Sequence, residues 1–240
     1  MTTIVSGFLS ISNGNRSFEK YVELGIQLLK INVPKIIFAD KLMYETIKSY
    51  DNDYTKIILY DKSESYLHPY INDIWLSNFK VNTDAPSKDT IEYMFVQSNK
   101  TEWIKKAIEI NHFHTNQFVW VDFGIRHLIT TDDNFNKYIL KLQNNSYTNV
   151  RIGSIWDVNS VYNINIYTNV AWYFAGSTLG GNKDALLIFA EKMKTQCLKI
   201  ITEHRTLMWE VNIWYLIYQE NQELFDCYPC NHNDSILDNY

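Results

Sequence analysis

Apolar residues in the first 60 positions alternate between two kinds of segment. Short continuous apolar runs are typical of strands covered on both faces, whereas an apolar residue every three or four positions is typical of an amphipathic helix. The predicted strands are Thr3–Leu9, Lys35–Ala39 and Thr55–Tyr60, and the predicted helices are Phe18–Ile31 and Lys41–Ser49. Strands that alternate with helices in this way predict an α/β fold with a mostly parallel sheet.

The rest of the chain continues this pattern with more helices. We expect helices at residues 87–97, 100–110, 132–143, 182–203 and 209–219, and strands at residues 118–121, 150–156, 164–174 and 224–228. The glycine-containing segment 176–181 is expected to be a loop. No linker or shift in composition divides the chain, so we expect one α/β domain over residues 1–240.

Composition and charge exclude several classes of protein. The chain has 22 basic and 27 acidic residues, a formal net charge of −5, and no long basic run that would follow a nucleic-acid backbone. No apolar run approaches the ~20 residues of a membrane-spanning helix. The first residues, TTIVSGFLSIS, lack the basic start and long apolar core of a secretion signal. We therefore expect no nucleic-acid partner, no integral membrane segment, and a cytoplasmic protein that is free or peripherally attached to a membrane.

Asp122 is the first candidate for chemistry, because it ends the apolar run Phe118–Val121 abruptly. Ligands of open α/β sheets bind at the carboxyl ends of the strands. A carboxylate at this place is suited to hold Mn²⁺ or Mg²⁺, which would neutralise a bound diphosphate. The alternative is an aspartate that only caps the following turn.

A metal at Asp122 would need a second protein ligand. Many such sites have another carboxylate two residues later, but that position is Gly124. The best remaining candidate is His232, and Asp234 is a weaker one. The alternative for His232 is a solvated histidine near the end of the chain.

Cationic and amide side chains provide candidates for phosphate binding. Asn13, Asn15 and Arg16 follow the first predicted strand, and Arg16 is suited to pair with a phosphate. Lys100 and Arg126 are similar candidates, and each is equally compatible with an ordinary surface cation.

Two further segments combine small or acidic residues with an apolar context. Glu210 begins an apolar helix, where it either complements the helix dipole or faces an acceptor as an acid. Its neighbours Trp209 and Trp214 are expected in the core rather than against a sugar. In the segment FAGSTLGG, Gly180 and Gly181 allow close approach of the backbone to a sugar, although the segment lacks the Lys-Ser/Thr ending of a phosphate-binding P-loop.

Six segments, in order, resemble the HtrL/YibB family of bacterial lipopolysaccharide-associated proteins. They are TIVSGFLSI, KIIFAD, NKTEWIKKAIEIN, FVWVDFGI, FAGSTLGG and WEVNIWYLIY, and they extend along nearly the whole chain. This family is grouped with GT-A glycosyltransferases. The resemblance therefore implies a single GT-A-type α/β domain with a mostly parallel mixed sheet, in which residues 1–122 form the nucleotide-binding half and residues 123–240 the half for sugar and acceptor.

The resemblance also implies an activity, the metal-dependent transfer of a sugar from a nucleoside diphosphate donor such as a UDP-sugar to a glycan or glycoprotein. It implies catalytic roles for Asp122 and Glu210. The implied donor contacts are Ser6, Phe8, Arg16, Lys100, Asp122, Gly180 and Gly181. The alternative is a non-catalytic module that binds nucleotide-sugars or glycans, which would agree with Gly124 in place of a second carboxylate. A nucleotidyltransferase is a third possibility, but the glycine-rich N-terminal loop expected for it is missing.

Overall fold

The computed structural model describes residues 1–11, 16–75, 83 and 86–240. Its seven strands form one sheet in the order β3-β2-β1-β4-β6-β5-β7. The strands are β1 (Thr2–Phe8), β2 (Lys35–Ala39), β3 (Thr55–Leu59), β4 (Gln117–Val121), β5 (Val150–Ser154), β6 (Phe174–Asn182) and β7 (Phe225–Pro229). Strand β6 is antiparallel to β4 and β5, and all other pairs are parallel. The predicted α/β fold with a mostly parallel sheet is confirmed.

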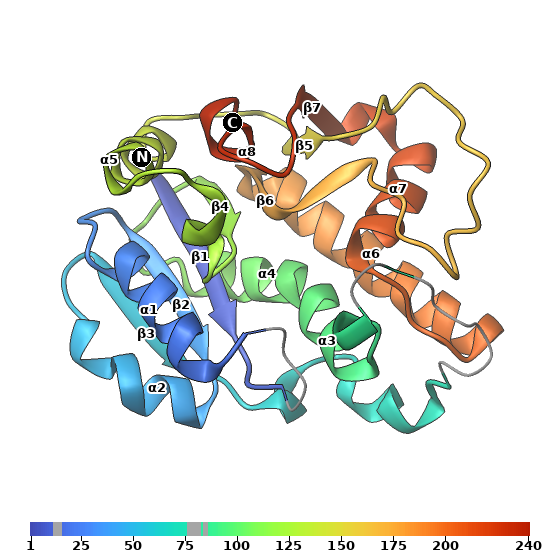
Figure 1. Cartoon of the computed structure of the whole chain (residues 1–240), viewed down its shortest axis with the longest axis horizontal. Helices are drawn as coiled ribbons and strands as arrows, with labels where there is room; N and C mark the ends of the chain where they lie inside the picture. The colour runs from blue at the N-terminus through green and yellow to red at the C-terminus, as the bar shows by residue number, and fades with distance from the viewer. Residues whose placement is uncertain (12–15, 76–82, 84–85) are drawn as a thin grey trace.

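Helices cover both faces of this sheet (Figure 1). They are α1 (Phe18–Leu29), α2 (Lys41–Ile47), α3 (Ile91–Ser98), α4 (Lys100–Ile110), α5 (Asp132–Leu142), α6 (Lys183–His204), α7 (Glu210–Glu220) and α8 (Ser235–Asp238). Side chains along β4 point alternately to the two faces, because successive residues of a strand do so. Phe118 and Trp120 join the core under α3, α4, α6 and α7, whereas Val119 and Val121 join the core under α1, α5 and α8.

Local capping fixes where many of the helices begin. At five helix starts a short polar side chain accepts a hydrogen bond from a backbone N–H of the first turn, which satisfies a donor that the helix leaves free. These residues are Ser17, Asp40, Thr90, Thr131 and Asn182. The prediction placed the starts of α1, α2, α4 and α5 correctly, and those of α3, α6 and α7 within a few residues. None of the helices in the described ranges is long and apolar enough to cross a membrane.

Two predictions between residues 164 and 181 are wrong. The expected strand at 164–174 is a loop up to Tyr173, and the expected loop at 176–181 belongs to β6. The buried side chain of Asn212 holds that loop, because its amide donates to Ile166 O and Asn169 O (2.7 Å each) and accepts from Ala171 N (2.8 Å).

The glycines of β6 are required by packing. A Cβ on Gly180 would lie 2.2 Å from the hydroxyl of Tyr240, and one on Gly181 would lie 2.1 Å from Asn149 O. Gly181 also has a φ of +145°, which side-chain-bearing residues rarely adopt. Gly180 and Gly181 thus form part of a buried strand. The prediction that these positions form a loop is wrong.

Candidate functional site

A pocket of about 300 Å³ opens at the carboxyl ends of β1 and β4. Gly7 and Phe8 end β1, Asp122 follows β4, and Gly176 and Ser177 belong to the start of the antiparallel strand β6. The backbone N–H of Asp122 donates to Ser177 O (3.0 Å), which fixes the aspartate beside β6. The pocket therefore lies where ligands of open α/β sheets bind, as predicted.

Lys100 lies at the centre of a charged cluster in this pocket. Its Nζ lies 3.0 Å from Glu210 Oε1 and 3.1 Å from Asp122 Oδ1, and it donates to Gly176 O at 2.7 Å. The side chain of Lys100 is only 3% exposed and that of Glu210 only 4%. Burial acts to lower the pKa of Lys100, but the charges of Asp122 and Glu210 outweigh it, so the pKa is raised. Lys100 therefore stays charged and is neutralised from within the protein.

Glu210 approaches the backbone of β6 very closely. A Cβ on Gly176 would lie 2.5 Å from Glu210 Oε1, so a glycine is needed at this position. The second oxygen, Oε2, is buried and has no hydrogen-bond partner among the described residues. Glu210 is one of the residues that line the pocket, and a buried oxygen without a partner has a free capacity to accept a proton or hydrogen bond.

Two stacked indoles form the wall beside Asp122. The rings of Trp103 and Trp120 are parallel within 7°, with centroids 5.6 Å apart, and Trp103 lies so close to Gly7 that a Cβ there would be 2.6 Å away. Trp120 Nε1 donates to Asp122 Oδ1 at 2.7 Å. Asp122 follows Trp120 by two residues at the end of β4, so the two side chains point to the same face of the sheet. The same oxygen of Asp122 thus receives both an indole N–H and the Lys100 ammonium.

A second wall of the pocket is aromatic. The rings of Trp172 and Trp209 meet edge to face with centroids 5.8 Å apart, and the ring of His232 meets Trp172 at 4.5 Å. Tyr93 packs against Trp209 at 5.2 Å. Trp209 thus lines the pocket although it is only 7% exposed, whereas Trp214 is fully buried in the core as predicted.

Two further cations line the pocket. Arg16 lies over the ring of Tyr21 (5.9 Å) and Lys88 over the ring of Tyr93 (5.8 Å). Burial lowers the pKa of Lys88, and the charge of Arg16 lowers it further. His127 lies nearby, with Nδ1 2.6 Å from Gly124 O, and burial is the main cause of its lowered pKa.

The structure brings together most of the residues that the sequence nominated. Those that line the pocket are Phe8, Arg16, Lys100, Asp122, Glu210 and His232. Ser6 is fully buried within β1, and neither it nor the pair Gly180 and Gly181 is among the described lining residues. Asn13 and Asn15 lie outside the described residues.

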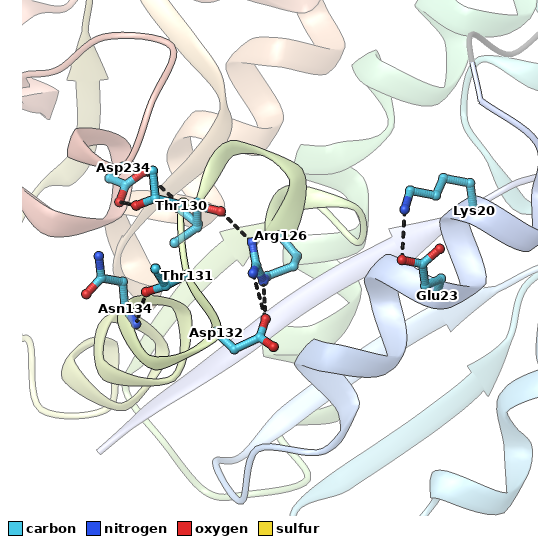
Figure 2. A network of polar contacts seen from close by, with 9 residues as sticks. Lys20, Glu23, Arg126, Thr130, Thr131, Asp132, Asn134 and Asp234 are labelled. Atoms are coloured by element: carbon cyan, nitrogen blue, oxygen red, sulfur yellow. Dashed lines mark hydrogen bonds and ion pairs between the residues drawn. The ribbon is translucent and has the colours of Figure 1, made fainter.

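Figure 2 shows that Arg126 and Asp234 take part in contacts that hold neighbouring segments together. Arg126 Nε donates to Asp132 Oδ1 at 2.7 Å, at the start of α5. Asp234 accepts from the backbone N–H (3.3 Å) and the hydroxyl (2.7 Å) of Thr130. Neither residue is among the described residues that line the pocket.

The described residues of the pocket do not form a ready-made protein cage for Mn²⁺ or Mg²⁺. Within the described ranges, no three His, Cys, Asp or Glu residues are grouped closely enough to hold a metal ion. Asp122 Oδ1 is occupied by two hydrogen donors, and the cation between the two carboxylates is the ammonium of Lys100. The ring of His232 packs edge to face on Trp172.

Several residues of the pocket were not predicted. Lys88 and Trp172 lie within an expected helix and an expected strand, and no motif around them indicates a binding site. Trp120 could have been found, because it precedes Asp122 by two residues on a strand and must share its side. Gly176 becomes important only through its contact with Glu210.

A model of a protein family described as "Bacterial protein of unknown function (HtrL_YibB)" matches residues 1–235. No curated protein matches the chain. Similar solved structures include mouse xyloside xylosyltransferase 1 in its apo form, with 11% identity and a TM-score of 0.48 over 96% of this chain and 86% of that one. Another is 4-diphosphocytidyl-2C-methyl-D-erythritol synthase from Anaerococcus prevotii, with 10% identity and a TM-score of 0.44 over 97% of this chain and 88% of that one.

A third similar structure is Rv0371c of Mycobacterium tuberculosis in complex with manganese, with 7% identity and a TM-score of 0.39 over 95% of this chain and 87% of that one. All three identities are 11% or lower and all three TM-scores are below 0.5. The function of the pocket therefore has to be argued from its own geometry.

Proposed function

The chain belongs to the HtrL/YibB family, and from this premise we propose that it is a GT-A-type glycosyltransferase. It transfers a sugar from a nucleoside diphosphate sugar to a hydroxyl of a glycan or glycoprotein. The observation that supports this proposal most is the cluster of Lys100, Asp122 and Glu210 in a pocket that is also lined by two cations without an ion pair among the described residues. Such a pocket offers one place for a diphosphate and another for a buried base.

Each half of the chain has its own part in the proposal. Residues 1–122 supply Phe8, Arg16 and Lys88 toward the nucleotide and diphosphate, and residues 123–240 supply Trp209 and Glu210 toward the sugar and acceptor. An indole face suits the apolar face of a sugar ring, because it buries C–H groups while the hydroxyls stay hydrated. The proposal includes the cytoplasmic location expected from the sequence.

The transfer step uses Glu210 as the base. The acceptor hydroxyl oxygen bonds to the anomeric carbon of the donor sugar, and the bond from this carbon to the diphosphate oxygen breaks. The bonding electron pair leaves on the diphosphate, and the hydroxyl proton passes to Glu210 Oε2, the oxygen without a partner among the described residues. Lys100 positions Glu210, and Asp122, whose side chain is 34% exposed, accepts from a hydroxyl of the donor sugar. No step is assigned to a metal ion.

The test is release of nucleoside diphosphate from a panel of UDP-, GDP-, CDP-, ADP- and dTDP-sugars, with and without mixed oligosaccharides as acceptors. At least one donor should be turned over. Glu210→Gln should lower turnover about 100-fold or more, the usual effect of losing a general base, while binding of the nucleoside diphosphate is retained. Glu191→Gln is the matched control, because Glu191 also bonds a lysine of α4, Lys105, but on the exposed surface.

Each other outcome contradicts part of the proposal. If the wild-type protein binds a nucleotide-sugar but never releases a nucleoside diphosphate from it, the protein is a non-catalytic binding module and not a glycosyltransferase. A protein that binds none of the panel is not a nucleotide-sugar enzyme. Full turnover by Glu210→Gln would exclude Glu210 as the base.

A further inference from the structure

Arg16 and Lys88 differ from the other cations near the pocket because neither forms an ion pair with a residue that the structure describes. Lys100 is paired with two carboxylates and Arg126 with Asp132. The ion pairs found within residues 1–11, 16–75, 83 and 86–240 include no partner for Arg16 or Lys88. Both are partly buried, and each lies over an aromatic ring of the pocket.

These two cations are also close enough to repel one another. The positive charge of Arg16 contributes to the lowered pKa of Lys88, after burial. Both charges also contribute to the lowered pKa of His127, and Lys88 contributes to that of His232. Partly buried charges are usually paired, because removing them from water is costly. The carboxylates of Glu210 and Asp122 act on Lys88 in the opposite sense, but neither forms an ion pair with it among the described residues. Two neighbouring cations placed in this way suit an anionic ligand.

The charge balance of the pocket points in the same direction. The described lining residues include three cations (Arg16, Lys88 and Lys100) and two carboxylates (Asp122 and Glu210), so the formal sum is 3 − 2 = +1. The whole chain carries −5. The cluster of Lys100 with its two carboxylates carries a formal −1, and Arg16 and Lys88 add +2. Among the described lining residues, these two cations are therefore the ones left to meet an entering anion.

We infer that Arg16 and Lys88 bind the diphosphate of the donor directly, so that donor binding requires no divalent cation. The inference rests on the proposed function and deepens it. A guanidinium and an ammonium would form charge-assisted hydrogen bonds with phosphate oxygens. They would also stabilise the negative charge that grows on the leaving diphosphate, which is the task that a divalent cation performs elsewhere. The two carboxylates, held by Lys100, stay free of metal and available to the sugar and acceptor.

The test is calorimetric titration with UDP, GDP, CDP, ADP and dTDP, each in EDTA and again in Mn²⁺. For the nucleotide that binds, the Kd in EDTA should agree with that in Mn²⁺ within about twofold. Arg16→Gln and Lys88→Gln should each weaken binding in EDTA about 10- to 100-fold, the usual value of a hydrogen bond to a charged group. Lys88→Arg keeps the charge and should retain most of the affinity.

Lys20→Gln is the matched control, because Lys20 is an exposed cation of α1 whose ammonium bonds Glu23 at 2.8 Å (Figure 2). It should bind as the wild type does, and melting curves establish that all variants are folded. Binding that appears only with Mn²⁺ overturns the inference and leaves the proposed function standing. Binding in EDTA that is unchanged in Arg16→Gln and Lys88→Gln overturns it as well. Absence of binding by all five nucleotides under both conditions overturns the inference and the proposed function together.

Discussion

Replacement of Lys100 by Met removes the one cation that separates two carboxylates. In the folded protein, Asp122 Oδ1 and Glu210 Oε1 each lie within 3.1 Å of the Lys100 ammonium. Methionine fills similar space but brings no charge, so both carboxylates lose their counter-ion. Glu210 is affected most, because its side chain is only 4% exposed and water cannot replace the lysine.

The expected loss of stability is large for a single substitution. Removal of one partner of a buried ion pair costs about 3–5 kcal/mol, because the other charge stays buried and unpaired. The raised pKa of Lys100 means that its contribution is fully present below the ordinary lysine range and is lost only as the pH rises through the raised pKa. At pH 7.5 the whole effect should therefore be observed. Gly176 O also loses its donor.

Urea unfolding followed by tryptophan fluorescence measures this loss. The control is Lys105→Met on the same helix, since Lys105 pairs with Glu191, whose side chain is 57% exposed. Such an exposed pair is worth about 0–1 kcal/mol. The double variant Lys100→Met/Glu210→Gln should recover about 1–3 kcal/mol relative to the sum of the two single changes. Two results would contradict this reasoning. One is a loss of unfolding free energy in Lys100→Met no greater than that in Lys105→Met. The other is a loss in the double variant equal to the sum of the losses in the two single variants.

Two other predictions concern a buried lysine and a buried glycine. Burial lowers the pKa of Lys35 from 10.5 to about 8. Between pH 8 and pH 10.5 the unfolded chain therefore binds more protons at this lysine than the folded protein does, so the free energy of unfolding rises with pH. Relative to Lys35→Met, the wild type should gain about 3 kcal/mol over this range. Urea unfolding of both proteins at pH 7 and pH 10.5 checks this, and a difference that does not change with pH would contradict it. Gly176→Ala should cost about 1–3 kcal/mol through overpacking, because the added Cβ would lie 2.5 Å from Glu210 Oε1. Gly124→Ala is its control, since the nearest atom there is 3.3 Å away, and equal losses in thermal melts would contradict the argument.

Elements that depend on local spacing and capping were predicted well from the sequence. The predicted strand Lys35–Ala39 is β2 residue for residue, and the predicted helix at 100–110 is α4. Apolar periodicity and caps are properties of neighbouring residues, so they are visible without the fold. The same is true of Asp122, because the end of an apolar run can be recognised in the sequence.

Strand β6 could not be recognised in the same way. Its segment FAGSTLGG contains three glycines, which locally favour a loop. Each of these glycines is needed by a neighbour that is distant in sequence: Glu210 beside Gly176, Tyr240 beside Gly180 and Asn149 beside Gly181. The preceding segment has the β-branched and aromatic residues of a strand, yet the Asn212 side chain holds it as a loop.

The sequence by itself determined the order of the elements, the α/β class and the end of β4 at which Asp122 stands. Only the tertiary structure decided which charges meet. Lys100 and Glu210 are 110 positions apart, and their contact makes Lys100 a buried counter-ion of a carboxylate. It also leaves Arg16 and Lys88 as the cations without an ion pair in the described part of the pocket. The reason is physical: periodicity is a property of neighbouring residues, whereas charges interact through space and are neutralised by whichever group the fold brings within a few ångströms.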